Sequence, residues 1–253
     1  MNSNEYLIAR PWPDGYIKPV LSGAMVGIVG LAPWTVLAPL NARIRPDVPW
    51  AALSTAAFLV LYIAWLNGAG WPARWVEYRK RSLRLWPPAP ARNAAASGLP
   101  VPLILLLLGL LYMMWVLVGR STQPPDLSAY PTTAYRFSIL IMGAVVSGVV
   151  EEAAFRGYMQ INLERYRPQS AILITSVAFT LFHGLHGIQA LLGLGAGLFA
   201  ASVLYGLLAQ RTGTILPGIA IHATGDLAYT YFGLLGGDGS LLFMSWLRTP
   251  NIT

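Results

Sequence analysis

Three charged residues interrupt a long apolar stretch of this sequence. Glu151 and Glu152 directly follow the apolar run 137–150, and Arg156 comes four residues after Glu152. A charged side chain at mid-bilayer costs about 2.5–3.5 kcal/mol on insertion scales, so such groups face the protein interior, pair with each other or line a wet cavity. Positions four apart share a helix face, which predicts a structural Glu152–Arg156 ion pair. Glu151 is rotated by about 100° and should lack a partner within its own helix, which leaves it available for chemistry.

The sequence places further polar side chains at a similar depth. Glu151 lies about 16 residues before Arg167 and His183 about 16 residues after it, so two antiparallel helices would hold both about 24 Å from that turn. His222 and Asp226 are four residues apart and share a face of a later helix. One glutamate, two histidines and one aspartate can therefore meet inside a helical bundle.

The composition indicates an all-α, polytopic integral membrane protein. Of the 253 residues 55% are hydrophobic and 11% charged, whereas soluble domains carry about 25% charged residues. The apolar runs are continuous rather than alternating, which favours helices over a β-barrel. A possible eighth membrane segment at 241–247 is too short to cross, and an interfacial or re-entrant placement is open for it. We expect about seven transmembrane helices, near 20–41, 50–69, 99–119, 136–165, 169–188, 190–209 and 213–235.

Composition also excludes some functions. The chain has no cysteine, so disulfides and thiolate catalysis are excluded. It has no Gly-x-Ser-x-Gly, so a serine hydrolase with a nucleophile elbow is unsupported. The net charge of +7 suits basic cytoplasmic loops, and we expect no nucleic-acid partner.

We divide the chain into an N-terminal membrane region at 1–135, a helix core at 136–235 that carries the charged motif and the histidines, and a short tail at 236–253. Basic residues concentrate in the loops that are cytoplasmic if the N-terminus is in the cytoplasm, and we expect a bacterial inner membrane. Within the basic loop 70–98, residues 74–86 interleave aromatic and basic side chains. That pattern suits a helix in the headgroup layer that binds anionic lipid, and a plain cytoplasmic loop is the alternative.

Three motifs occur in order on separate predicted spans. Glu151-Glu152-Ala-Ala-Phe-Arg156 fits EExxxR, Phe179-Thr-Leu-Phe-His183 fits FxxxH, and His222-Ala-Thr-Gly-Asp226 fits HxxxD. Together they resemble the CAAX-prenyl-protease and bacteriocin-processing (CPBP) family of intramembrane endopeptidases. The resemblance covers about residues 136–235. It implies a helical bundle with a polar catalytic cavity, in which the catalytic set is Glu151, His183, His222 and Asp226.

The resemblance and the residue types are consistent with one mechanism. Glu151 acts as general base on a water that His183 orients, and His222 with residue 226 stabilises the oxyanion. His186, three residues from His183, suits an ordinary hydrogen bond near the membrane edge better than a place among the reacting groups. Structural or supporting roles are expected for Glu152, Arg156, Phe179 and His186.

Residue 226 leaves alternatives open. Relatives often have asparagine there, and an ionised aspartate cannot donate a hydrogen bond to an oxyanion. Asp226 is therefore protonated, orients His222 or binds a metal. Zinc is possible, because Glu151, His183, His222 and Asp226 would form a chemically sensible site. We favour catalysis without a metal or other cofactor.

We expect the substrate to be a membrane-associated peptide or protein. Two other classes stay open: a proton- or ion-coupled transporter, and a non-catalytic immunity or assembly factor of the same fold. Buried acids and histidines also mark proton paths. Charged groups in only three spans, without a visible inverted repeat, speak against a transporter.

Overall fold

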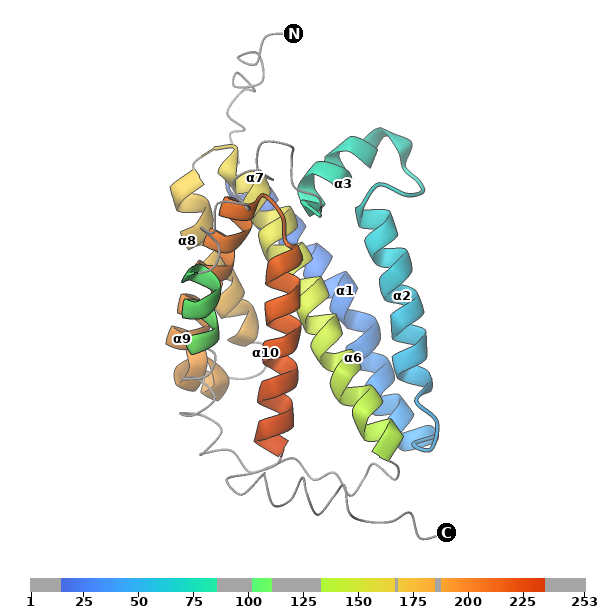
Figure 1. Ribbon diagram of the computed structural model, residues 1–253. Helices are drawn as coiled ribbons and strands as arrows, with labels where there is room; N and C mark the ends of the chain where they lie inside the picture. Colours follow the sequence, from blue (N-terminus) through green and yellow to red (C-terminus); the bar gives the residue numbers. More distant parts are fainter. Residues whose placement is uncertain (1–14, 86–101, 111–132, 167, 185–187, 235–253) are drawn as a thin grey trace.

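The computed structural model describes residues 15–85, 102–110, 133–166, 168–184 and 188–234, and within these ranges every regular element is a helix. The prediction of an all-helical protein is thus confirmed for these residues. The helices run in order (Figure 1): α1 (Ile17–Ile44), α2 (Trp50–Leu66), η2 (Ala73–Trp75), α3 (Val76–Leu83), α6 (Thr133–Glu151), η4 (Glu152–Gln160), α7 (Ile161–Glu164), α8 (Pro168–His183), α9 (Ile188–Thr212) and α10 (Leu216–Leu234).

The central element is the continuous helical path formed by α6, η4 and α7. Its middle part, η4, is a π-helix, a rare conformation that often occurs at functional sites. The sequence predicted one helix over 136–165, and the π-helical conformation of its middle part was not predicted. Every residue from Glu151 to Gln160 is buried, which places the charged motif in the interior of the bundle.

Small residues let the other helices approach this path closely. A Cβ atom at Gly23 of α1 would lie 2.7 Å from the Cβ of Met159, and one at Gly148 of α6 would lie 2.8 Å from the backbone nitrogen of Ala223 in α10. Such close approach is typical of helix packing in membranes. As a result α6 lies beside both α10 and α1, with α2 on the same side as α1 (Figure 1).

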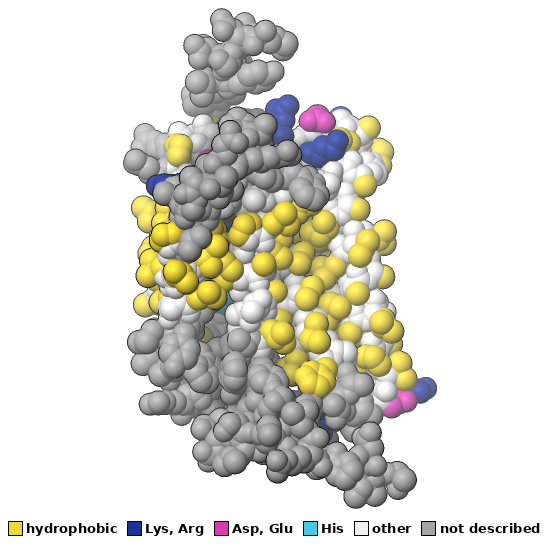
Figure 2. Space-filling model, viewed as in Figure 1, with side chains coloured by type: hydrophobic (Ala, Val, Ile, Leu, Met, Phe, Trp, Pro, Cys, Tyr) yellow, Lys and Arg dark blue, Asp and Glu magenta, His cyan; other side chains and the backbone are white. Residues whose placement is uncertain are grey.

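Several helices suit a bilayer. Three helical stretches are long and apolar enough to cross it, Ile17–Ile44, Tyr135–Glu164 and Leu194–Thr212, and Trp50–Leu66 and Ser170–His183 are apolar but shorter. Figure 2 shows apolar side chains over the middle of the bundle, with Lys and Arg side chains toward its ends. The chain is an integral membrane protein.

The number of spans stays a prediction. Of the predicted span 99–119 the structure describes residues 102–110, which are helical. The segment 241–247 lies outside the described residues. The helix predicted at 169–188 is shorter than expected, because α8 ends at His183.

Part of the basic segment after α2 is buried against the bundle. The sequence predicted a helix in the headgroup layer over residues 74–86, and that placement stays a prediction. In the structure Ser82 and Leu83 are fully buried, and the Asn162 amide donates to the Tyr78 hydroxyl at 3.3 Å and the Ser82 hydroxyl at 3.2 Å. Arg79 is also buried. This face of α3 therefore packs on η4 and α7, and the basic side chains left exposed are Arg74, Lys80 and Arg81.

Candidate active site

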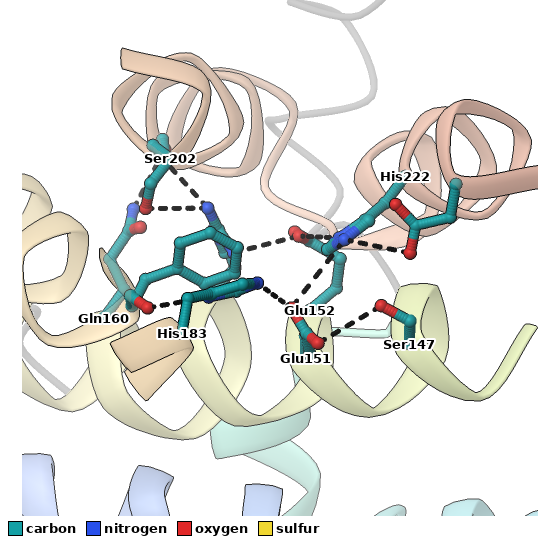
Figure 3. A network of polar contacts seen from close by, with 11 residues as sticks. Ser147, Glu151, Glu152, Gln160, His183, Ser202 and His222 are labelled. Carbon is teal, nitrogen blue, oxygen red and sulfur yellow. Dashed lines mark hydrogen bonds and ion pairs between the residues drawn. The ribbon is translucent and has the colours of Figure 1, made fainter. Parts of the chain in front are cut away.

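Helices α6, α8 and α10 bring the four residues of the predicted catalytic set together. Glu151 Oε2 lies 3.8 Å from His183 Nε2 and 3.7 Å from His222 Nε2. His222 Nε2 also lies 3.7 Å from Asp226 Oδ2. Figure 3 shows the Glu151 and His183 side chains pointing toward each other, with His222 reaching the same carboxylate from the neighbouring helix. The side chains of Glu151 and His222 are 9% and 8% exposed, whereas that of Asp226 is 39% exposed and lies at the open side of the cluster.

The two oxygens of Glu151 have different surroundings. Ser147, one helical turn earlier in α6, donates its hydroxyl to Oε1 at 3.1 Å. Oε2 is buried and accepts no hydrogen bond from the described residues. The prediction that Glu151 lacks a partner in its own helix is therefore wrong. A serine at position i−4 was the available signal, but serine hydroxyls in helices usually bond to a backbone carbonyl instead.

Both ring nitrogens of His222 face carboxylates. Nδ1 lies 3.0 Å from Glu152 Oε1, and Nε2 faces Glu151 and Asp226. The ring stacks on Tyr205, with centroids 5.2 Å apart. An imidazolium donates from both nitrogens, so this arrangement suits the doubly protonated ring.

The orientation of His183 follows from its backbone partner. Nδ1 lies 2.9 Å from the carbonyl oxygen of Phe179. A carbonyl only accepts, which assigns the proton to Nδ1. In a neutral ring Nε2 then carries the lone pair, on the side of Glu151. The Phe179 ring packs against the imidazole, with centroids 4.5 Å apart.

A buried ion pair between Arg156 and Glu152 lies next to this cluster. Arg156 Nη1 lies 3.0 Å from Glu152 Oε1, with neither side chain exposed, as the i, i+4 spacing indicated. Arg156 Nη2 donates to the Ser202 hydroxyl at 2.8 Å, and the guanidinium lies over the rings of Phe179 and Tyr205. The sequence did not single out Ser202 or Tyr205. Their spacing of three residues on one helix face was the only signal.

Two glycines, Gly148 in α6 and Gly218 in α10, allow α10 to lie close to the acidic motif. A Cβ at Gly218 would lie 2.7 Å from Glu152 Oε2, and one at Gly148 would meet the backbone of Ala223. This close contact lets His222 reach both glutamates, although it lies only about 9 Å into α10 at 1.5 Å per residue.

The donor atoms are those that zinc prefers, but their spacing is wide. Two ligands of a tetrahedral zinc with bonds of about 2.0–2.1 Å lie about 3.4 Å apart, compared with 3.7–3.8 Å here. Within the ranges that the structure describes, no group of three or more His, Cys, Asp or Glu side chains is arranged to hold a metal ion. The site as it stands does not fit zinc without movement of these side chains. His186 lies outside the described residues.

One comparison with known proteins bears on this site. Residues 133–228 match the family described as Type II CAAX prenyl endopeptidase Rce1-like. Over this region the chain is similar to the CAAX protease family. The match begins at the first residue of α6 and ends two residues after Asp226, so it contains all three motifs, and the predicted resemblance is confirmed. No curated protein and no solved structure matches the chain.

Proposed function

We propose that this CAAX-protease-family protein is an intramembrane endopeptidase that hydrolyses a peptide bond of a membrane-associated peptide or protein. The observation that carries the proposal is the placement of Glu151 Oε2, which faces Nε2 of both His183 and His222. Separations of 3.7–3.8 Å are too long for direct hydrogen bonds. In apo structures catalytic groups are often this loosely spaced.

The attacking group is a water held between an acid and an imidazole. One O–H of this water donates to Glu151 Oε2 and the other to the unprotonated Nε2 of His183. Glu151 takes the first proton as general base, and the resulting hydroxide attacks the peptide carbonyl carbon.

His222 stabilises the oxyanion that forms. As an imidazolium anchored to Glu152 through Nδ1, it donates its Nε2–H to the negatively charged oxygen. Asp226 acts through His222, since an ionised carboxylate cannot donate to an oxyanion. When the tetrahedral intermediate breaks down, protonated Glu151 gives its proton to the leaving amine, which regenerates the carboxylate.

The test uses purified protein in proteoliposomes and a panel of quenched fluorogenic peptides that carry a farnesyl chain, a geranylgeranyl chain or an apolar helix. We expect cleavage of at least one peptide by the unmodified protein and by Glu77→Gln, a control at an exposed glutamate of α3. Glu151→Gln should lower kcat at least about 100-fold, because it removes the general base. Equal rates for both variants would refute the proposal.

The same preparation separates the competing explanations. Proton flux into the liposomes that Glu151→Gln abolishes, without peptide cleavage, would favour the transporter. Stoichiometric zinc that is lost in His183→Ala and His222→Ala, together with activity lost on chelation, would replace the metal-independent mechanism. Failure to cleave any peptide or to carry protons would favour a non-catalytic factor.

The exposed side of the α3 region suits anionic lipid. Arg74, Lys80 and Arg81 are exposed there, and Trp71 and Trp75 are 85% and 47% exposed. Cationic and indole side chains at the end of an apolar bundle match the headgroup layer. We expect phosphatidylglycerol to co-purify with the protein, and to be lost when the three basic residues are changed to glutamine. Unchanged lipid retention would contradict this part of the proposal.

A further inference from the structure

We infer that Ser147 is a positioning residue that directs one chosen oxygen of Glu151 toward the two histidines. The inference rests on the proposed function only for its effect on catalysis. The geometry of the Ser147–Glu151 pair stands without it.

The first step is the asymmetry of the carboxylate. Ser147 donates to Oε1 at 3.1 Å, while Oε2 faces His183 and His222 at 3.8 and 3.7 Å. A carboxylate that is free to turn about its last bond would present either oxygen to the histidines. The hydrogen bond to Oε1 fixes this rotation and leaves Oε2 as the basic atom.

The second step is the local helix geometry. Residues four apart in a regular α-helix are neighbours on its surface, and α6 is regular up to Glu151. The π-helix begins at the next residue, Glu152. The Ser147–Glu151 pair thus lies in the last regular turn before the π-helix. In the same turn Gly148 allows α10 to approach closely. This turn therefore determines the distance between Glu151 and His222.

The third step is electrostatic. Glu151 is buried, and the titratable groups facing it are His183 from α8 and His222 from α10, with Asp226 beyond. A hydroxyl can donate to a carboxylate oxygen, and hydrogen bonds to charged groups are the stronger kind. Without this donor, neither oxygen of Glu151 would accept a hydrogen bond from the described residues, and the carboxylate could turn its oxygens away from the histidines.

The decisive experiment compares serine variants with the unmodified protein by steady-state kinetics, which separate kcat from KM. Ser147→Ala removes the donor to Oε1, so we expect kcat alone to fall. Ser147→Thr, which keeps the hydroxyl, should retain the original kcat. Ser138→Ala is the matched control, because Ser138 lies on the same helix and donates to the Tyr135 carbonyl instead.

The catalytic consequence is tested on a peptide that the unmodified protein cleaves. Ser147→Ala should lower kcat about 10- to 100-fold, the factor expected for one hydrogen bond to a charged group, with little change in KM. An unchanged kcat in Ser147→Ala, where Glu151→Gln is inactive, would overturn the inference. Full activity of Glu151→Gln would overturn the proposed function instead, so the two failures are distinguishable.

Discussion

The side chain of Arg156 has no exposed surface and lies within a membrane-spanning helix. Its guanidinium is accommodated by Glu152, by Ser202 and by the faces of two aromatic rings. A buried pair of this kind contributes little net stability, but removal of one partner leaves an uncompensated buried charge. The pair also fixes the oxygen that meets His222 Nδ1. Arg156 therefore connects the stability of the bundle to the orientation of His222, to which the proposed mechanism assigns the oxyanion.

This gives a prediction for Arg156→Met. The substitution removes the guanidinium from the buried Glu152, leaves only His222 beside that carboxylate, and should destabilise the folded protein by about 3–5 kcal/mol. Thermal unfolding in detergent, followed by circular dichroism, measures the effect. Arg81→Met is the control, because Arg81 is exposed on α3 and its loss should cost little. Equal melting temperatures for the two variants would contradict the role assigned to the pair.

At the scale of helices, the contact between α6 and α10 determines whether the site assembles. A Cβ added at Gly148 would lie 2.8 Å from the backbone nitrogen and 3.0 Å from the Cα of Ala223. Backbone atoms cannot move aside as a flexible side chain can, so Gly148→Ala must push the two helices apart. His222 and Asp226 are carried on the helix that moves.

We expect Gly148→Ala to lower kcat by at least about tenfold, since misplacing a reacting group by about 1 Å can cost 100-fold. Gly195→Ala serves as the matched control, because its new Cβ would meet side-chain atoms no closer than 3.6 Å. The peptide assay measures both variants. An active Gly148→Ala protein would show that the helix contact does not limit the site.

The sequence predicted much at this scale, and what it missed has physical causes. The cost of charge in lipid predicted that Glu151, Glu152 and Arg156 face the interior, and helical rise predicted that Glu151 and His183 share a depth. The contact between His222 and Glu152 depends on the position of α10 along α6. That position is set by close helix contacts at glycines, which the sequence alone does not reveal. The π-helix has no recognised sequence signal here. The burial of Arg79 depends on how α3 packs against the rest of the chain, and the sequence of a basic loop does not indicate such packing.

At the scale of the whole molecule, the proposed reaction depends on orientation in the membrane. The start of α1, the α3 region and the ends of α7 and α9 lie at one end of the bundle (Figure 1), and the α1–α2 turn lies at the other. The first end carries most of the described basic residues, and from the positive-inside tendency we propose that it faces the cytoplasm.

The chain has no cysteine, so single-cysteine variants test this orientation without a background. In intact bacterial cells a membrane-impermeant maleimide should label Asp47→Cys, in the α1–α2 turn. Glu77→Cys, on α3, should be labelled only after permeabilisation. Both positions are exposed, so differences in burial do not confuse the result. The opposite pattern would invert the proposed topology.

The central claim is that Glu151 drives hydrolysis of a peptide bond within the membrane bundle. Mass spectrometry of new chain termini, in membranes that contain either the unmodified protein or Glu151→Gln, tests it most directly. We predict at least one membrane-associated polypeptide whose new termini appear with the unmodified protein, while its uncut form accumulates with Glu151→Gln. Identical sets of termini in the two membranes would contradict the claim.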